Sequence, residues 1–271
     1  MKKIKISKSF IIILSIFFIF FSYSFIESKF IEYKKIEISN IQIPKAFDNF
    51  KIIFISDLHK RLYSEPLKIK KVVEEINKQN SDLIILGGDY INYNKKETVV
   101  FSELSKLKSK YGVYGVYGNH DTWIGEDVLK NYFSKNNINN LNNNSYWIEK
   151  DGEKIKLGGV GDLWTGKQDL SKTVSDVNKD DYLILVSHNP DYIEEIKNEN
   201  KIDLVLSGHT HGGQITFFNW APLNPSRYGY LKGLYKFDNK EMYITRGIGE
   251  FFAPFRFFSR PEISEITLKS E

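Results

Sequence analysis

Five short strings of metal-ligating residue types contain all five histidines of the chain. The strings are Asp57-Leu58-His59, Gly87-Gly88-Asp89, Gly118-Asn119-His120-Asp121, Ser187-His188 and Gly208-His209-Thr210-His211. Imidazoles, carboxylates and an amide oxygen are ligands that borderline to hard divalent metals accept. The chain has no cysteine, which excludes disulfides, thiolate ligands and a cysteine nucleophile. The residue types therefore indicate a metalloenzyme.

Every string follows an apolar run, so its polar residues are expected where a strand ends. In open α/β sheets, functional groups gather outside the carboxyl ends of the strands, which can unite residues as distant in sequence as Asp57 and His211. The candidate ligands are too many for one tetrahedral site but suit two neighbouring metals bridged by a carboxylate. Such ions, about 3.5–4 Å apart, activate water and clamp phosphoryl oxygens. The glycines before Asp89, Asn119 and His209 fit tight turns in which the backbone approaches the metals closely.

The five strings, in this order from Asp57 to His211, resemble the calcineurin-like metallophosphoesterases. The tail, with Gly212-Gly213-Gln214 and Arg246-Gly247-Ile248-Gly249, resembles the membrane-associated bacterial branch of that family. The resemblance implies an α/β fold, a four-layer αββα sandwich in which two mixed β-sheets are flanked by helices. It also implies hydrolysis of a phosphodiester, a pyrophosphate or a phosphomonoester with two divalent metal ions per chain. Manganese, iron, zinc and cobalt all suit these ligands.

The resemblance also assigns roles to residues. Asp57, His59 and His211 would hold one metal, Asn119, His188 and His209 the other, and Asp89 would bridge the two. Hydroxide on the metals would be the nucleophile, because their charge lowers the pKa of bound water. His120 would be a general acid for the leaving oxygen or an electrostatic partner of the phosphoryl group, with Asp121 orienting its ring.

Two alternatives accompany these roles. His120 could instead have a structural role in supporting Asn119. The whole chain could also be a non-catalytic protein of the same fold that binds a partner. Degenerate ligands or a missing His120 would favour that second alternative, and the sequence shows neither.

The N-terminus indicates a membrane anchor. Lys2, Lys3, Lys5 and Lys8 precede the uncharged stretch from Ser9 to Ile26, whose 18 residues approach the lower limit for spanning a bilayer as a helix. We expect residues 1–8 to be a cytoplasmic basic region and residues 9–26 a transmembrane signal-anchor, which places the rest on the outer face of the cell membrane. Lysines beyond the stretch weaken that orientation. The alternatives are a signal peptide cleaved near Ser24 and a helix buried in a globular domain.

Beyond the anchor, the pattern alternates strands with helices. Residues 27–46 are expected to be a juxtamembrane connector that enters a first strand near residues 36–43, and residues 47–271 the catalytic domain. Predicted strands cover 51–56, 82–86, 112–117, 182–186 and 203–206, predicted helices 65–79, 97–108, 126–134 and 190–197, and a hairpin 146–150 with 154–160. The last sixty residues indicate short strands and turns. Together these elements predict a largely parallel sheet with a partly antiparallel partner.

The remaining features bear on partners. The formal charge of +4 is spread along the chain without a basic block, so no specific nucleic acid is expected. The anchor and the aromatic tail favour a phosphorylated small molecule or a lipid-linked substrate, and no feature of the sequence sets the oligomeric state. Arg246 and Arg256 could each bind a phosphate or form a salt bridge. The phenylalanines of the tail are more typical of sheet core than of a lipid-facing lip; they are Phe251, Phe252, Phe255, Phe257 and Phe258.

Overall fold

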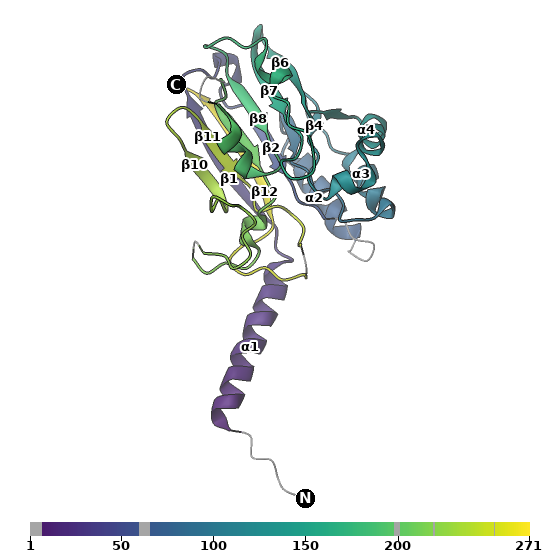
Figure 1. Cartoon of the computed structure of the whole chain (residues 1–271), viewed down its shortest axis with the longest axis vertical. Helices are drawn as coiled ribbons and strands as arrows, with labels where there is room; N and C mark the ends of the chain where they lie inside the picture. The colour runs from purple at the N-terminus through teal and green to yellow at the C-terminus, as the bar shows by residue number, and fades with distance from the viewer. Residues whose placement is uncertain (1–6, 60–65, 198–200, 219, 252) are drawn as a thin grey trace, which may run out of the picture.

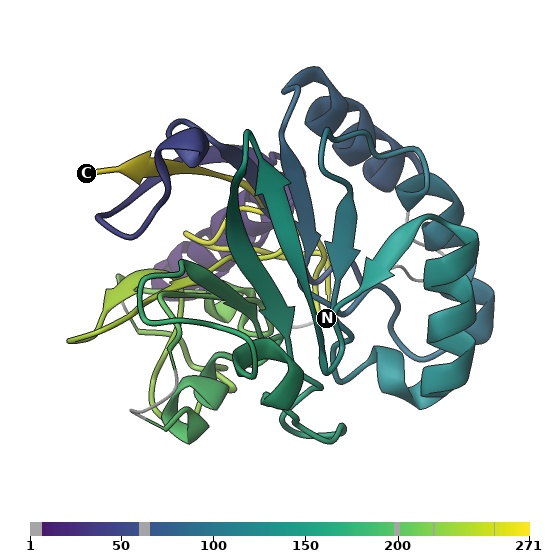
Figure 2. The same ribbon diagram turned by 90° about the horizontal axis from the view of Figure 1, so that it is seen from above.

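Two six-stranded sheets stack face to face in the computed structural model, which describes residues 7–59, 66–197, 201–218, 220–251 and 253–271 (Figures 1 and 2). The first sheet has the spatial order β1 (Glu32–Asn40), β12 (Glu262–Ser270), β2 (Lys51–Ile55), β3 (Leu83–Leu86), β4 (Val113–Gly115) and β5 (Ile138–Asn140). The second has the order β10 (Gly233–Lys236), β11 (Glu241–Ile244), β9 (Leu204–Ser207), β8 (Leu183–Val186), β7 (Glu153–Gly159) and β6 (Asn144–Lys150).

Both sheets are mixed. Strands β2 to β5 are parallel, β12 joins β2 antiparallel, and β1 lies parallel to β12. In the second sheet, β7, β8, β9 and β11 are parallel, and the edge strands β6 and β10 are antiparallel to their neighbours. The parallel centre of each sheet brings several strand ends to one edge of the molecule, where the metal-ligating strings begin.

Side chains that alternate along the strands define the layers. In β2, Ile52 and Phe54 lie in the core between the sheets, whereas Ile53 and Ile55 pack in the core under the helices. Those helices are α2 (Pro66–Lys78), α3 (Val100–Leu104) and α4 (Glu126–Lys135). The outer face of the second sheet is covered more thinly, by α5 (Ser171–Val174) and the 3₁₀ helix η4 (Pro190–Glu195). The predicted αββα sandwich is confirmed.

Two predicted helices differ from the structure. The helix expected at 190–197 is the 3₁₀ helix η4, because the Asn189 side chain caps it through the amide of Asp191 and Ile196 is already extended. The helix expected at 97–108 is a 3₁₀ turn, η2 (Lys95–Val99), followed by the short α3. Ser102 and Ser105 donate their hydroxyls to carbonyl oxygens three residues back, and such local bonds compete with a regular helix.

The asparagine-rich tract from Asn136 to Asn144, which carried no predicted element, forms β5 and the start of β6. Asn137 and Asn143 adopt positive φ angles of 55° and 52°, a conformation that asparagine accepts more readily than most residues. The Asn139 amide donates to the Val113 carbonyl oxygen of β4 at 3.1 Å. The asparagines thus supply the turns and edge contacts that end the first sheet.

The helix α1 (Lys8–Glu27) projects from the sandwich (Figure 1). Its length and mean hydropathy of 2.4 fit both a membrane span and a signal sequence, and only 6% of its apolar window is buried. That exposure contradicts the alternative of a buried globular helix. Residues 1–6 lie outside the described part of the chain.

The strand expected within the connector is an integral part of the first sheet. It begins at Glu32 and pairs with β12 along its whole length, from Glu32 beside Glu262 to Asn40 beside Ser270. The sandwich therefore includes residues that precede Phe47, and the domain limits drawn from the sequence remain predictions.

Candidate metal centre

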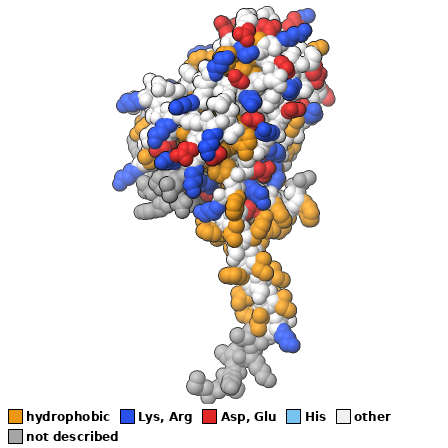
Figure 3. Space-filling view, turned by 180° about the vertical axis from the view of Figure 1, so that it is seen from behind, with side chains coloured by type: hydrophobic (Ala, Val, Ile, Leu, Met, Phe, Trp, Pro, Cys, Tyr) orange, Lys and Arg blue, Asp and Glu red, His pale blue; other side chains and the backbone are white. Residues whose placement is uncertain are grey.

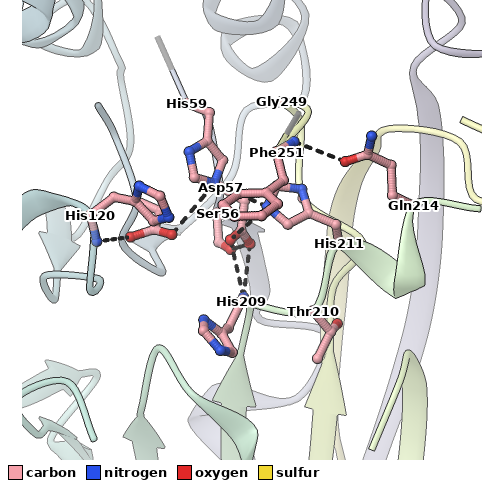
Figure 4. A network of polar contacts seen from close by, with 12 residues as sticks. Ser56, Asp57, His59, His120, His209, Thr210, His211, Gln214, Gly249 and Phe251 are labelled. Atoms are coloured by element: carbon pink, nitrogen blue, oxygen red, sulfur yellow. Dashed lines mark hydrogen bonds and ion pairs between the residues drawn. The ribbon is translucent and has the colours of Figure 1, made fainter. Parts of the chain in front are cut away.

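The metal-ligating strings converge at the carboxyl ends of parallel strands from both sheets. Asp57 and His59 follow β2, Asp89 follows β3, His188 follows β8, and His209 and His211 follow β9. Because β2 and β3 are adjacent and in register, the amide of Asp57 donates to Gly88 O at 2.9 Å and that of His59 to Asp89 O at 3.0 Å. These side chains are all buried. Figure 4 shows His59, His209 and His211 gathered around Asp57.

The first cluster consists of Asp57, His59 and His211, whose ligand atoms lie within 4.8 Å of one another. The Nε2 atoms of the two imidazoles face each other at 3.0 Å, and His211 Nε2 lies 3.6 Å from Asp57 Oδ1. Three potential ligand atoms that converge in this way, with two imidazole nitrogens opposed, fit a cation between them.

The second cluster consists of Asp89, His188 and His209. His209 Nδ1 lies 3.2 Å from His188 Nε2, which in turn lies 3.3 Å from Asp89 Oδ2. The same Oδ2 lies 3.4 Å from His59 Nε2 of the first cluster. The Asp89 carboxylate therefore lies between the two clusters, where a bridging ligand is required.

Asn119 provides an independent test of the fit. Its Oδ1 atom is buried and has no hydrogen-bond partner among the described residues, and the side chain lines the same pocket as Asp89 and His209. A buried amide oxygen without a partner costs free energy unless another group, such as a metal ion, binds it. The residues present therefore fit a pair of divalent ions.

Hydrogen bonds behind the clusters fix the orientation of the ligands. His188 Nδ1 lies 2.7 Å from the Gly87 carbonyl oxygen, so it carries the proton and leaves Nε2 free to bind metal. The Asp57 carboxylate accepts the amide of His209 at 3.0 and 3.1 Å and the hydroxyl of Ser56. The contacts of His188 with Gly87 and of His209 with Asp57 each join one metal-ligating string to another.

The backbone at the site is strained at five non-glycine residues. Positive φ angles occur at Asp57 (54°), His59 (42°), Asp89 (55°), His209 (69°) and His211 (52°). Each costs roughly 1–2 kcal/mol, and such outliers cluster at functional sites.

The glycines keep space for the carboxylates. A Cβ on Gly118 would clash with Asp89 Oδ1, and one on Gly208 would lie 2.5 Å from Asp57 Oδ2. Gly88 contributes through its conformation, because its φ of 93° is one that L-residues rarely adopt. Close approach of the backbone to the ligand groups thus requires these glycines.

Electrostatics favour the metal-binding forms of most ligands. Burial lowers the pKa of His59 and of His211 to about 3 and that of His209 well below its usual range. Burial alone would also lower the pKa of His188, but the nearby carboxylates, Asp89 first, raise it. The pKa of Asp89 is lowered overall, since the imidazoles, His188 first, outweigh its burial. Neutral imidazoles and ionised carboxylates are the forms that bind metal.

His120 lies beside the first cluster without belonging to either imidazole pair. Its ring is perpendicular to that of His59 with the centroids 4.8 Å apart, and its amide donates to Asp89 Oδ1 at 2.9 Å. One ring nitrogen falls within 4.8 Å of the ligand atoms of His59 and Asp89. Its Nδ1 atom lies 3.0 Å from the carbonyl oxygen of Asn92, which therefore orients the ring.

The prediction that Asp121 orients the His120 ring is wrong. The Asp121 carboxylate accepts backbone amides instead, from Asp89 at 2.7 Å, Gly118 at 2.9 Å, Tyr90 at 2.9 Å and Ile91 at 3.3 Å. Asp121 begins the 3₁₀ helix η3 (Asp121–Ile124), which turns its side chain back toward the end of β3. Its carboxylate thus links the string that contains Asp89 to the string that contains Gly118, and thereby positions Asp89.

A pocket of about 640 Å³ opens over both clusters. Its wall is largely aromatic and aliphatic: Tyr93, Trp123, Trp164, Pro222, Leu223, Pro225 and Phe251. Trp164 stands perpendicular to His209 with the ring centroids 4.3 Å apart, and Tyr93 lies 4.8 Å from His120. No Lys or Arg lines this pocket in the part of the chain that the structure describes.

This wall is not predicted from the sequence. Trp123 and Trp164 both follow predicted strands, which is the one signal that points to them, and Phe251 is expected in the sheet core. Phe251 instead faces His120 with the ring centroids 5.5 Å apart. Phe252 lies outside the described residues.

The two tail arginines have structural contacts. Arg246 pairs with Glu32 at 3.0 Å and with Glu262 at 2.5 Å. Arg256 is completely buried and donates to backbone carbonyl oxygens, including those of Arg246 and Ser259 at 2.9 Å. Both guanidinium groups already have protein partners, so neither side chain is positioned to bind a phosphate.

The sandwich and the paired clusters at its strand ends are those of a metallophosphoesterase, with side chains that fit two metal ions. Residues 50–213 match the model of the calcineurin-like phosphoesterase family. The chain is 35% identical over 236 residues to the uncharacterized metallophosphoesterase YkuE of Bacillus subtilis, covering 84% of this chain and 82% of that protein. It is 32% identical over 231 residues to the phosphodiesterase YaeI of Escherichia coli, covering 81% and 82%. The chain belongs to the calcineurin-like phosphoesterase family and is a metal-dependent phosphoesterase.

Proposed function

We propose that the chain is a membrane-anchored phosphodiesterase whose substrate carries an apolar, lipid-linked group beside the scissile phosphate. The observation that carries this proposal is the aromatic and aliphatic wall directly over the two clusters. A phosphomonoester or polyphosphate brings two or more charges, which proteins usually meet with Arg or Lys. A diester brings one charge, and the described wall offers its second ester group apolar contact. The name of the relative YaeI, a phosphodiesterase, also supports a diester.

The positions of the side chains support the roles that the family resemblance assigns. Asp57, His59 and His211 would hold one ion, Asn119, His188 and His209 would hold the other, and Asp89 would lie between them. When bound, the two ions supply activated water and neutralise charge on the phosphoryl group. Manganese, iron, zinc and cobalt remain the candidate ions, because nitrogen and oxygen ligands accept all four.

His120 is proposed as the general acid. Its Nδ1–H donates to the Asn92 carbonyl oxygen, which leaves Nε2 to carry a proton to the leaving oxygen. Phe251 and Tyr93 lie against its ring and limit access of water to it. Asp121 does not contact the substrate in this proposal; it positions Asp89 by accepting the backbone amides of Asp89 and Gly118.

The catalytic test uses the full-length protein, because Glu27 and β1 are part of the folded domain. The protein in detergent micelles, loaded with manganese, should hydrolyse bis-p-nitrophenyl phosphate faster than p-nitrophenyl phosphate, and should have a lower KM for a phospholipid diester in the same micelles. His188→Ala is the matched control and should lose turnover together with metal. No turnover by a folded protein loaded with manganese, iron, zinc or cobalt would refute the proposal, and a preference for the monoester would refute the diester assignment.

The proposed location is the cell membrane, with α1 retained as a single span and the catalytic domain on the outer face. The chain has no cysteine, so Ile41→Cys provides one exposed label site at the end of β1 remote from α1. An impermeant maleimide should label this variant in intact cells. Labelling only after lysis would reverse the orientation, and an N-terminus near Ser24 in the mature protein would show that the span is cleaved.

A further inference from the structure

The last two turns of α1 are packed against the catalytic domain. Phe20 lies 4.8 Å from Phe257 between ring centroids, and Phe21 lies 5.4 Å from Phe255. The amide of Arg256 donates to the carbonyl oxygen of Ser24 at 2.9 Å. The helix is therefore joined to the domain by side chains and backbone from Phe20 onward.

A buried carboxylate completes this junction. Glu27 is 3% exposed and accepts the amides of Phe258 at 3.1 Å and Ser259 at 2.9 Å. The Ser259 hydroxyl in turn donates to the carbonyl oxygen of the metal-ligating His211 at 3.0 Å. The end of α1 is thus held at a defined position beside the metal centre.

The length of α1 has a consequence for the domain. The uncharged stretch from Ser9 to Ile26 is 18 residues long, or about 27 Å as a helix, against a hydrocarbon core of about 30 Å. If the part from Phe20 onward stayed in water, the remainder would reach only about 16 Å. The helix can span the bilayer only if the turns from Phe20 onward also lie in the bilayer. The residues of the catalytic domain that pack on these turns must then enter the bilayer as well.

Four aromatic residues of the domain contact these turns: Phe217, Phe255, Phe257 and Phe258. Together with Phe218 and Trp220, which belong to the same turn as Phe217, they form an aromatic collar at the base of the helix. Four of them remain exposed although they are large and apolar: Phe218 at 96%, Trp220 at 63%, Phe258 at 58% and Phe217 at 43%. Hydrophobic side chains gather where the helix leaves the domain (Figure 3). An exposed apolar patch of this kind marks an interaction surface.

The backbone turn at the tip of the collar also indicates an interaction surface. Backbone bonds of 2.8 and 3.1 Å between Phe217 and Trp220 close it, and Phe218 adopts a φ of 59°. Two features of Phe218 lower the stability of the fold: a bulky residue is disfavoured at this positive φ, and its aromatic ring is exposed to water. A partner that accepts the ring would offset the second cost.

Cationic side chains border the collar. Lys232 Nζ donates to the Phe258 carbonyl oxygen at 2.8 Å, Lys29 Nζ lies 5.0 Å from the centroid of the Phe25 ring, and Arg260 follows Ser259 at the surface. Aromatic rings flanked by Lys and Arg are typical of segments at the membrane–water interface. The cations complement anionic lipid headgroups.

We propose that the aromatic collar is a membrane-seating surface, inserted at the acyl–headgroup boundary of the bilayer that α1 crosses. This proposal rests on the proposed retention of α1 as a span. The collar lies next to the pocket in the chain, because Gln214 and Phe251 line the pocket and shortly precede the two segments of the collar. Gln214 also joins these segments: it accepts the amide of Phe251 at 2.8 Å and donates to Ala253 O at 3.1 Å. Insertion of the collar would therefore hold the pocket close to the surface of the bilayer.

The absence of cysteine allows a direct test in the full-length chain. Single variants Phe218→Cys, Ile41→Cys and Ile16→Cys are spin-labelled and reconstituted in vesicles of phosphatidylcholine and phosphatidylglycerol. Collision rates with oxygen, which concentrates in lipid, are compared with those of a water-soluble nickel chelate. Ile41, 79% exposed, is the matched control for an apolar surface residue far from the collar. Trp220→Cys replaces Phe218→Cys if the latter loses metal or helical circular dichroism.

The proposal expects the label at residue 218 to collide more with oxygen than with the nickel chelate, and the label at residue 41 to do the reverse. A lipid-embedded label at residue 16 with a water-exposed label at residue 218 would overturn the collar while leaving the anchor intact. A water-exposed label at residue 16 would overturn the anchor and the collar together. Spin–spin broadening at residue 218, with shielding from both reagents, would show that a second copy of the chain covers the collar and would also overturn the proposal.

Discussion

The guanidinium of Arg256 donates from Nη1 to the main-chain oxygen of His211 at 3.3 Å. The same group also donates to the carbonyl oxygens of Gly247 at 3.3 Å and of Gly249. The amide of Gly249 in turn donates to Asp57 O at 2.6 Å. The buried guanidinium of Arg256, whose neighbours Phe255 and Phe257 pack on α1, is therefore linked to the backbone of both His211 and Asp57 in the first cluster. The junction with α1 and the candidate metal centre are therefore parts of one hydrogen-bonded unit.

Replacement of Arg256 should therefore destabilise the whole protein. Arg256→Met removes hydrogen bonds to several buried carbonyl oxygens, and we expect a loss of at least about 3 kcal/mol in the free energy of unfolding. For a chain of this size that corresponds to a fall in Tm of about 6–12 °C, measured by circular dichroism in detergent. Arg260→Met, at an exposed neighbouring position, is the control and should leave Tm unchanged. Equal Tm values for the two variants would contradict the role of Arg256.

Strand-end ligands were predictable because each apolar run is short and ends in a metal-ligating string. The pairing of β2 with β3, for example, places Asp57 beside Gly88 with no further information. The position of Asp121 was not predictable from its neighbour His120, because the turn η3 directs the two side chains apart. The partners of Asp121 are backbone amides from another strand end, and such contacts leave no pattern in side-chain types.

The collar could not be predicted from the sequence for a related reason. Phe217, Phe255 and Phe257 belong to irregular segments that are distant in the sequence and come together against α1 and, for Phe217 and Phe257, against each other, so no periodicity in the sequence connects them. The prediction that the tail phenylalanines form sheet core is wrong for Phe255 and Phe257, which pack on α1, and for Phe258, which is exposed. Aromatic composition alone could not distinguish these environments.

His120 and His188 should separate rate from metal binding. His120→Ala should keep both ions by elemental analysis but lose about 10²–10⁴-fold in kcat, the contribution typical of a general acid. His188→Ala should lose an ion, because its Nε2 atom faces Asp89 and His209 in the second cluster. If His120→Ala lost metal to the same extent as His188→Ala, the group formed by His59, Asp89 and His120 would have to be counted as a ligand set instead.

Gly118 should tolerate no side chain. In Gly118→Ala the new Cβ would clash with Asp89 Oδ1, and a carboxylate displaced by that clash could no longer lie between the clusters. We expect loss of both bound metal and turnover. Gly152→Ala is the matched control: no atom lies within 4 Å of its Cβ, so it should cost only about 1 kcal/mol of backbone strain and keep full metal content. Retention of two ions by Gly118→Ala would contradict the bridging position of Asp89.

Metal binding should stabilise the fold, since the ligands come from both sheets and only the folded chain brings them together. Free manganese at about 100 times the dissociation constant of a site adds about 2.7 kcal/mol per site to the free energy of unfolding. Chemical denaturation of the full-length protein with a chelator and with manganese measures the difference. In His188→Ala the increment should be about half as large, and an unchanged denaturation midpoint in the wild-type protein would show that the clusters do not bind the ion.

The collar should affect turnover of lipid substrates selectively. In Phe218→Ser/Trp220→Ser, hydrolysis of a phospholipid diester in vesicles should fall at least about tenfold. Burial of one such side chain is worth about 1.5–3 kcal/mol, and 1.4 kcal/mol corresponds to a factor of ten. Hydrolysis of water-soluble bis-p-nitrophenyl phosphate should be unchanged, because neither residue lines the pocket. Ile41→Ser is the control for loss of an exposed apolar side chain, and an equal fall with both substrates would mean that the collar supports the fold of the site and does not seat it on the membrane.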